Sequence, residues 1–186
     1  MSIYLRNIIR FVLLVLIQVL LLKQIPLSWW TAPGGIPPYV PYIYPLFLLA
    51  LPFGASVPFL MIAGFVMGLT IDMYMDTGGI HAAACVLMAF VRTNILAALL
   101  PRRLAEYQNT SPGIRSMGWA PFMTYAAILL AIHHIAFFTL EIWSMVSFGY
   151  LLVKILVSLV TSSLFVFLYA LFFSNSIGTV YYDNNN

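Results

Sequence analysis

The stretch "GLTIDMYMDTGGIHAAA", residues 68 to 84, joins two of the most apolar parts of the chain through two aspartates, two adjacent glycines and a histidine. Gly78 and Gly79 can reverse the chain, because glycine adopts turn conformations that other residues avoid. Thr77 or Asp76 is suitably placed to cap the start of the following helix. The stretch therefore predicts two helices joined by a tight turn.

The composition indicates where these helices lie. The 186 residues are 63% hydrophobic and only 7% charged, whereas soluble domains are about 45 to 50% apolar and about 25% charged. The excess apolar surface must face lipid or other helices. The net charge of +3 is too small and too scattered to indicate nucleic-acid binding, and the single Cys85 excludes an intramolecular disulfide. An all-α integral membrane protein is predicted, with Cys85 as a small buried residue.

Proline and glycine divide the chain into helices, because both interrupt regular helical structure. Six transmembrane helices are expected near residues 5–25, 43–53, 57–73, 79–100, 121–141 and 149–173. Together they would form one domain over residues 1–173, followed by a polar cytoplasmic tail over residues 174–186. The first helix is expected to be a retained anchor rather than a signal peptide, because no small-residue cleavage pattern follows it.

Basic residues predict the orientation, since lysine and arginine concentrate in cytoplasmic loops. Four crossings before residue 101 place Arg6 and Arg10 on the same side as Arg102, Arg103 and Arg115. Three crossings would place one of these two arginine clusters outside the cell. Both termini are therefore expected in the cytoplasm, and the turn after residue 75 outside.

Charged residues at membrane depth are candidate sites, because each is costly there unless it is paired. Asp72 and Asp76 would share a face of a continuing helix. Lys154 is expected at a depth similar to that of Asp72, and an ion pair between them is the first prediction. Glu141 competes for the same lysine, and a lone Lys154 reaching to the membrane surface is the alternative.

Arg92 is expected near the bilayer middle and needs an acceptor. The candidates are a carboxylate, the exposed carbonyls of the broken region between the second and third helices, or a group of a partner protein. The adjacent His133 and His134 diverge by about 100° on a helix and are expected to make separate structural contacts. Asp72, Asp76 and His81 are chemically acceptable metal ligands, although a structural role is preferred for them.

Small residues indicate close helix packing. Gly64 and Gly68 form a GxxxG motif, and Ser158 and Ser162 offer a second pair at the same spacing. Packing inside the same bundle is preferred to contact between subunits. The sequence has no nucleophile elbow, HExxH, phosphate-binding glycine loop or CxxC motif, so no enzyme activity and no cofactor are expected.

The sequence resembles the MreD family of bacterial rod-shape-determining membrane proteins. The resemblance is carried by "LKQIPL" at 22–27, "YPLFLLALPFG" at 44–54 and above all "GFVMGLTIDMYMDTGGIHAAACVLMAFVR" at 64–92. Gly64, Gly68, Asp72, Gly79 and Ala82 match the family pattern. The proline-rich loop at 28–45 and the asparagine-rich tail depart from it.

The resemblance implies a non-enzymatic scaffold of the cell-wall elongation machinery in the bacterial inner membrane. Such a scaffold binds the bitopic protein MreC and, indirectly, MreB, RodA and the class B penicillin-binding transpeptidase. It also implies a six-helix fold similar to the substrate-binding components of energy-coupling-factor transporters. The alternative function is therefore a vitamin-binding transporter component, with a pocket lined by Trp29, Trp30 and the outer acids.

Overall fold

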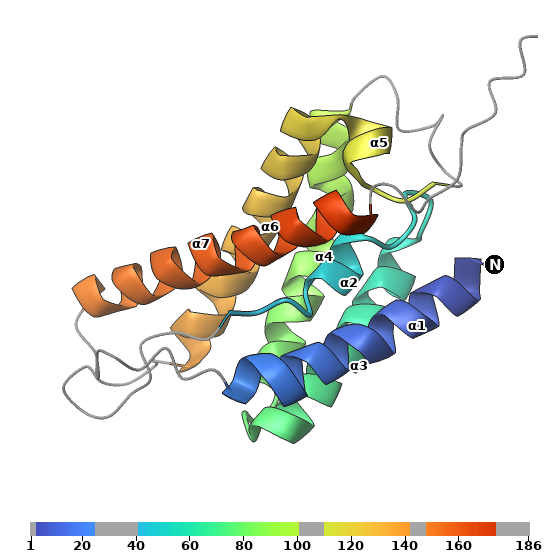
Figure 1. Ribbon diagram of the computed structural model, residues 1–186. Coiled ribbons are helices and arrows are strands. Elements are labelled where there is room, and N and C mark those ends of the chain that lie inside the picture. The colour runs from blue at the N-terminus through green and yellow to red at the C-terminus, as the bar shows by residue number, and fades with distance from the viewer. Residues whose placement is uncertain (1–2, 25–40, 101–109, 142–147, 174–186) are drawn as a thin grey trace, which may run out of the picture.

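The computed structural model describes residues 3–24, 41–100, 110–141 and 148–173, and all regular structure within these ranges is helical (Figure 1). The five long helices are α1 Ile3–Leu16, α3 Val57–Met75, α4 Ile80–Leu99, α6 Trp119–Glu141 and α7 Phe148–Phe173. A π-helical turn, η1 Ile17–Leu21, and a 3-10 turn, η2 Leu22–Gln24, continue α1. α2 Leu46–Leu49 and α5 Ile114–Met117 are single turns.

Four helices in the described ranges are long and apolar enough to cross a membrane: α3, α4, α6, and α7 as far as Leu171. Each buries less than half of its most apolar stretch inside the protein, so the remaining apolar surface is available to lipid. Ile62 of α3 and Val160 of α7 are 64% and 68% exposed, as expected of side chains that face lipid. The chain is a multi-pass, all-α membrane protein.

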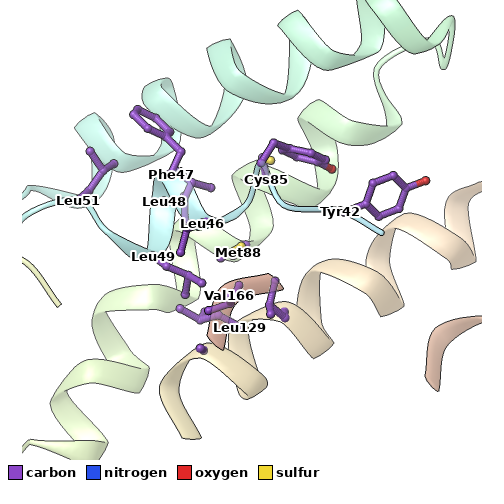
Figure 2. Close-up of a cluster of buried hydrophobic side chains, with 14 of the residues drawn as sticks. Tyr42, Leu46, Phe47, Leu48, Leu49, Leu51, Cys85, Met88, Leu129 and Val166 are labelled. Carbon is purple, nitrogen blue, oxygen red and sulfur yellow. The ribbon is translucent and has the colours of Figure 1, made fainter. Parts of the chain in front are cut away.

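The long helices pack in sequence order, α3 against α4, α4 against α6 and α6 against α7. Residues 41–53, called here the buried segment, run through the bundle between these helices and α1 (Figure 1). Figure 2 shows how the side chains of this segment, such as Leu46 and Leu49, meet Met88 of α4, Leu129 of α6 and Val166 of α7. The buried segment is therefore the centre of the hydrophobic core.

The bounds of α3, α4, α6 and α7 lie within two residues of those predicted from the sequence. The helix predicted over residues 43–53 is wrong, because only residues 46–49 are helical. Pro45 begins α2 without donating a backbone hydrogen bond, and Pro52 disfavours helical backbone at the residue before it. The short α5 was not predicted. The tail and most of the proline-rich loop lie outside the described residues.

Candidate functional site

The junction between α3 and α4 depends on two glycines of α3. A Cβ atom added at Gly64 would lie 2.9 Å from the backbone oxygen of Cys85, and one added at Gly68 would overlap the backbone of Ala82. The two helix backbones are therefore in direct contact at these positions, as in other membrane helix pairs with small residues at the interface. Of the two predicted uses of the GxxxG motif, the structure has the one inside the bundle.

Asp72 connects the end of α3 to the start of α4. Its carboxylate accepts hydrogen bonds from the backbone N–H groups of His81 at 3.0 Å and Ala82 at 2.9 Å, and from the Thr77 hydroxyl at 2.6 Å. These N–H groups have no acceptor within the first turn of α4, and a carboxylate there also interacts favourably with the helix dipole. Asp72 thus caps α4 from the preceding helix.

The cap predicted from Thr77 or Asp76 is wrong, since neither makes a side-chain bond to the first turn of α4 and the residue before α4 is Gly79. α3 ends at Met75, and the exposed Asp76 adopts the left-handed conformation with φ of 58°. The two aspartates therefore do not share a helix face. Gly79 has φ of 96°, a value that favours glycine and explains its place in the turn.

The ion pair predicted between Asp72 and Lys154 is also wrong. Lys154 Nζ lies 2.6 Å from Oε2 of Glu141 and 4.9 Å from the ring centre of Phe138. The lysine side chain is 3% exposed and that of Glu141 31% exposed, so the pair lies at the edge of the bundle where α6 ends and α7 begins. Asp72 uses both oxygens on α4 instead, and its charge is stabilised by N–H groups rather than by a cation.

The buried segment is held at its first residues by two side chains. Gln18 of η1 donates from Nε2 to the carbonyl of Pro41 at 3.2 Å and accepts from the N–H of Ile43 at 2.9 Å. Ser162 of α7 accepts from the N–H of Tyr42 at 3.0 Å. These bonds replace the partners that a helix would supply, as buried backbone requires.

Arg92 of α4 holds the other end of the buried segment. Its Nη2 donates to the carbonyl oxygen of Leu51 at 2.5 Å, and its Nε donates to the Tyr125 hydroxyl at 2.9 Å. Tyr125 in turn donates to the carbonyl of Leu49 at 3.1 Å. Arg92 is fully buried, and Pro52 adds a carbonyl at 3.5 Å. Of the three acceptors expected for Arg92, the structure therefore has the carbonyls of the broken region.

Three side chains meet around Tyr44 in the buried segment. The Tyr44 hydroxyl lies 2.6 Å from Nδ1 of His81 and 2.6 Å from Nε2 of His133. A phenol has one hydrogen to donate, so one imidazole accepts it while the other donates to the oxygen. His134 contacts the Leu130 carbonyl at 2.7 Å and the Ser162 hydroxyl at 3.1 Å. The adjacent histidines thus make separate contacts.

These contacts show what the polar residues can do chemically. Within the described ranges, no three His, Cys, Asp or Glu side chains are placed to hold one metal ion. His81 belongs to the Tyr44 cluster, and Asp72 is occupied by α4. These polar side chains thus bond to the buried segment and to the start of α4.

Sequence reasoning missed several residues of this network. Gln18, Tyr44 and Tyr125 were not singled out, although a glutamine in an apolar helix is itself a signal of a buried contact. Ser162 was recognised only as a small residue, and the structure adds its hydrogen bonds.

A shallow apolar groove lies on the membrane-facing side of α3 and α4. Its lining includes the small residues Gly79, Ala82 and Ala83. It also includes Phe65 and Phe90, which are 49% and 53% exposed. The groove is a recess that the described residues of α3 and α4 offer to a neighbouring molecule.

Comparison with protein-family models, curated proteins and solved structures finds no match to this chain.

Proposed function

We propose that this protein is a non-enzymatic scaffold of the MreD type, which binds MreC and through it helps to organise MreB, RodA and the class B penicillin-binding transpeptidase. The observation that carries the proposal is the α3–α4 junction. The residues with which the sequence resembles the family act together there: two glycines permit the contact, one aspartate caps α4, and Gly79 permits the turn. In this chain the matching residues thus serve one structural task, which supports the proposal.

The proposal includes six crossings of the bacterial inner membrane with both termini in the cytoplasm. The four long apolar helices supply four of them. The other two crossings come first in the chain. One is α1 with its continuation as far as Gln24. The other is the buried segment, a broken crossing whose backbone is stabilised in the membrane by hydrogen bonds from Gln18 near one end and Arg92 near the other.

We expect the transmembrane helix of MreC to pack in the groove between α3 and α4. Small residues in the lining let a second helix approach closely, and the exposed aromatic residues of the lining provide contact area. Because the lining includes the motif residues Gly79 and Ala82, the partner surface and the internal junction would depend on the same short stretch of sequence.

The same contacts argue against the vitamin-carrier alternative. A ligand pocket needs polar groups directed into an open cavity. In the part of the chain that the structure describes, His81 and His133 both bond to the Tyr44 hydroxyl, and Asp72 bonds to α4. Trp29 and Trp30, expected in such a pocket, lie outside the described residues.

The test compares Ala83→Phe, which fills the groove, with Val160→Phe, a matched change on the lipid-facing side of α7. Recovery of MreC with the purified protein should fall about tenfold for the first variant, which corresponds to about 1.4 kcal/mol. It should not change for the second. Depletion of the protein should also disturb rod growth. Normal cell width with a defect in vitamin uptake would overturn the proposal in favour of the transporter.

A further inference from the structure

Two arginines lie one helical turn apart near the start of α1. Arg6 and Arg10 have the four-residue spacing that places side chains on the same helix face. Arg10 is 7% exposed and donates to the Tyr169 hydroxyl at 3.1 Å, the Ala50 carbonyl at 3.0 Å and Asn7 Oδ1 at 3.2 Å. All three acceptors are neutral. Arg10 therefore connects α1 to the buried segment and to α7, but none of these partners neutralises its positive charge.

Arg6 is only half-buried, but its Nε atom is inaccessible to solvent and has no hydrogen-bond partner among the described residues. A buried guanidinium donor without an acceptor is unfavourable, and more so beside a second cation. Among the described residues the arrangement thus lacks an acceptor, and one that carries negative charge would complete it.

The described carboxylates are all at the opposite end of the bundle. Asp72 and Asp76 lie at the end of α3, and Glu141 lies at the end of α6. α1 begins beside the end of α7, as the Arg10 to Tyr169 bond shows, whereas Lys154 near the start of α7 pairs with Glu141. Within the described ranges, the arginine end of the bundle therefore contains no counter-ion.

The surroundings indicate the chemical class of the missing anion. Exposed apolar side chains flank the two arginines along α1, among them Ile8, Ile9 and Val12. Acyl chains can lie against such a surface, while guanidinium groups near a helix end are at the depth of the lipid phosphates. A guanidinium also matches the geometry of a phosphate group better than an ammonium does.

We propose that Arg6, positioned beside Arg10, binds the phosphate group of an anionic phospholipid at the end of the bundle where α1 begins and α7 ends. Arg10 is the fixed element, since its bonds to Ala50 and Tyr169 hold it in place. Arg6 supplies a donor that has no partner among the described residues. The site is independent of MreC and of any role in cell shape.

The experiment titrates the purified full-length protein in detergent with short-chain phosphatidylglycerol, and measures thermal unfolding and lipid adducts by native mass spectrometry. Phosphatidylcholine of the same chain length and inorganic phosphate are separate arms. Phosphatidylglycerol should bind and raise the unfolding temperature, and Arg6→Gln should weaken this binding about tenfold. Arg6→Lys, which keeps the charge but loses the planar donor geometry, should weaken it about threefold.

The matched control is Arg115→Gln, which removes an exposed arginine of α5 and should change binding less than about twofold. Equal losses for Arg6→Gln and Arg115→Gln would show diffuse attraction rather than a site. Equal binding of phosphatidylcholine, or full competition by inorganic phosphate, would also overturn the assignment to an anionic lipid. The unfolding temperature of the Arg6→Gln variant without lipid, compared with that of the parent protein, distinguishes a folding defect from a binding defect.

Discussion

The α3–α4 junction and the buried segment solve the same problem, close contact inside a membrane bundle, by different means. At the junction, small residues let two regular helices touch, and one aspartate completes the turn. In the buried segment the backbone is largely irregular, and side chains from η1, α1, α4, α6 and α7 complete the hydrogen bonds that its own short turns do not make. The junction requires glycines without a Cβ atom, whereas the buried segment requires side-chain donors and acceptors from other helices.

The largest expected effect is at the junction. Gly68→Ala adds a Cβ that overlaps the backbone of Ala82, so the helices must separate along their contact. We expect a loss of about 3 kcal/mol or more in stability, at the upper end of overpacking effects. The control is Gly149→Ala, where a Cβ meets no atom within 4 Å. Thermal unfolding in detergent compares the two, and equal behaviour would show that the close contact does not form.

The buried segment should respond next most strongly, to Arg92→Lys. Lysine keeps the charge but cannot reach the Leu51 carbonyl and the Tyr125 hydroxyl together with a planar group. Leaving one buried polar group without a partner costs about 1 to 3 kcal/mol, and we expect a loss of about 2. Arg115→Lys is the control. If both variants unfold at the temperature of the parent protein, the hydrogen bond from Arg92 to the Leu51 carbonyl does not contribute to stability.

A smaller effect is expected from Asp72→Asn, because an amide oxygen still accepts one N–H from α4 but loses the negative charge at the helix start. The loss should be about 1 to 2 kcal/mol by analogy with other helix caps. Asp76→Asn, at the neighbouring exposed position, should change stability by less than about 0.5 kcal/mol. A larger effect at Asp76 than at Asp72 would contradict the assignment of the cap.

The smallest effect concerns the ion pair between Glu141 at the end of α6 and Lys154 near the start of α7. In a double-mutant cycle, Lys154→Met and Glu141→Gln should show a coupling of about 1 kcal/mol, since Glu141 is partly exposed. Lys154→Met and Asp72→Asn should instead be additive, because these residues share no contact. Coupling to Asp72 rather than to Glu141, measured from the same set of unfolding curves, would restore the pairing predicted from the sequence.

The long helices were predictable because their signals are local. Apolar runs of sufficient length, ended by proline or glycine, indicate α3, α4, α6 and α7 without knowledge of any neighbour. The GxxxG motif was predictable for the same reason, since a missing side chain permits close approach whatever lies opposite. The exposed carbonyls offered to Arg92 also followed from local signals, the prolines and glycine that break the chain between residues 52 and 58.

The partners of charged residues required the tertiary structure. Asp72 and Lys154 were predicted to pair from their expected depth alone, but depth does not determine which helices are neighbours or how they are rotated. The turn after Asp76 brings the first N–H groups of α4 onto Asp72, and Glu141 lies nearer to Lys154. By itself the sequence determined an all-α membrane protein with close packing at residues 64 to 68. Only the tertiary structure decided that residues 41–53 form a buried, mostly non-helical core, because the side chains that complete its hydrogen bonds lie from 23 to 120 positions away in the chain.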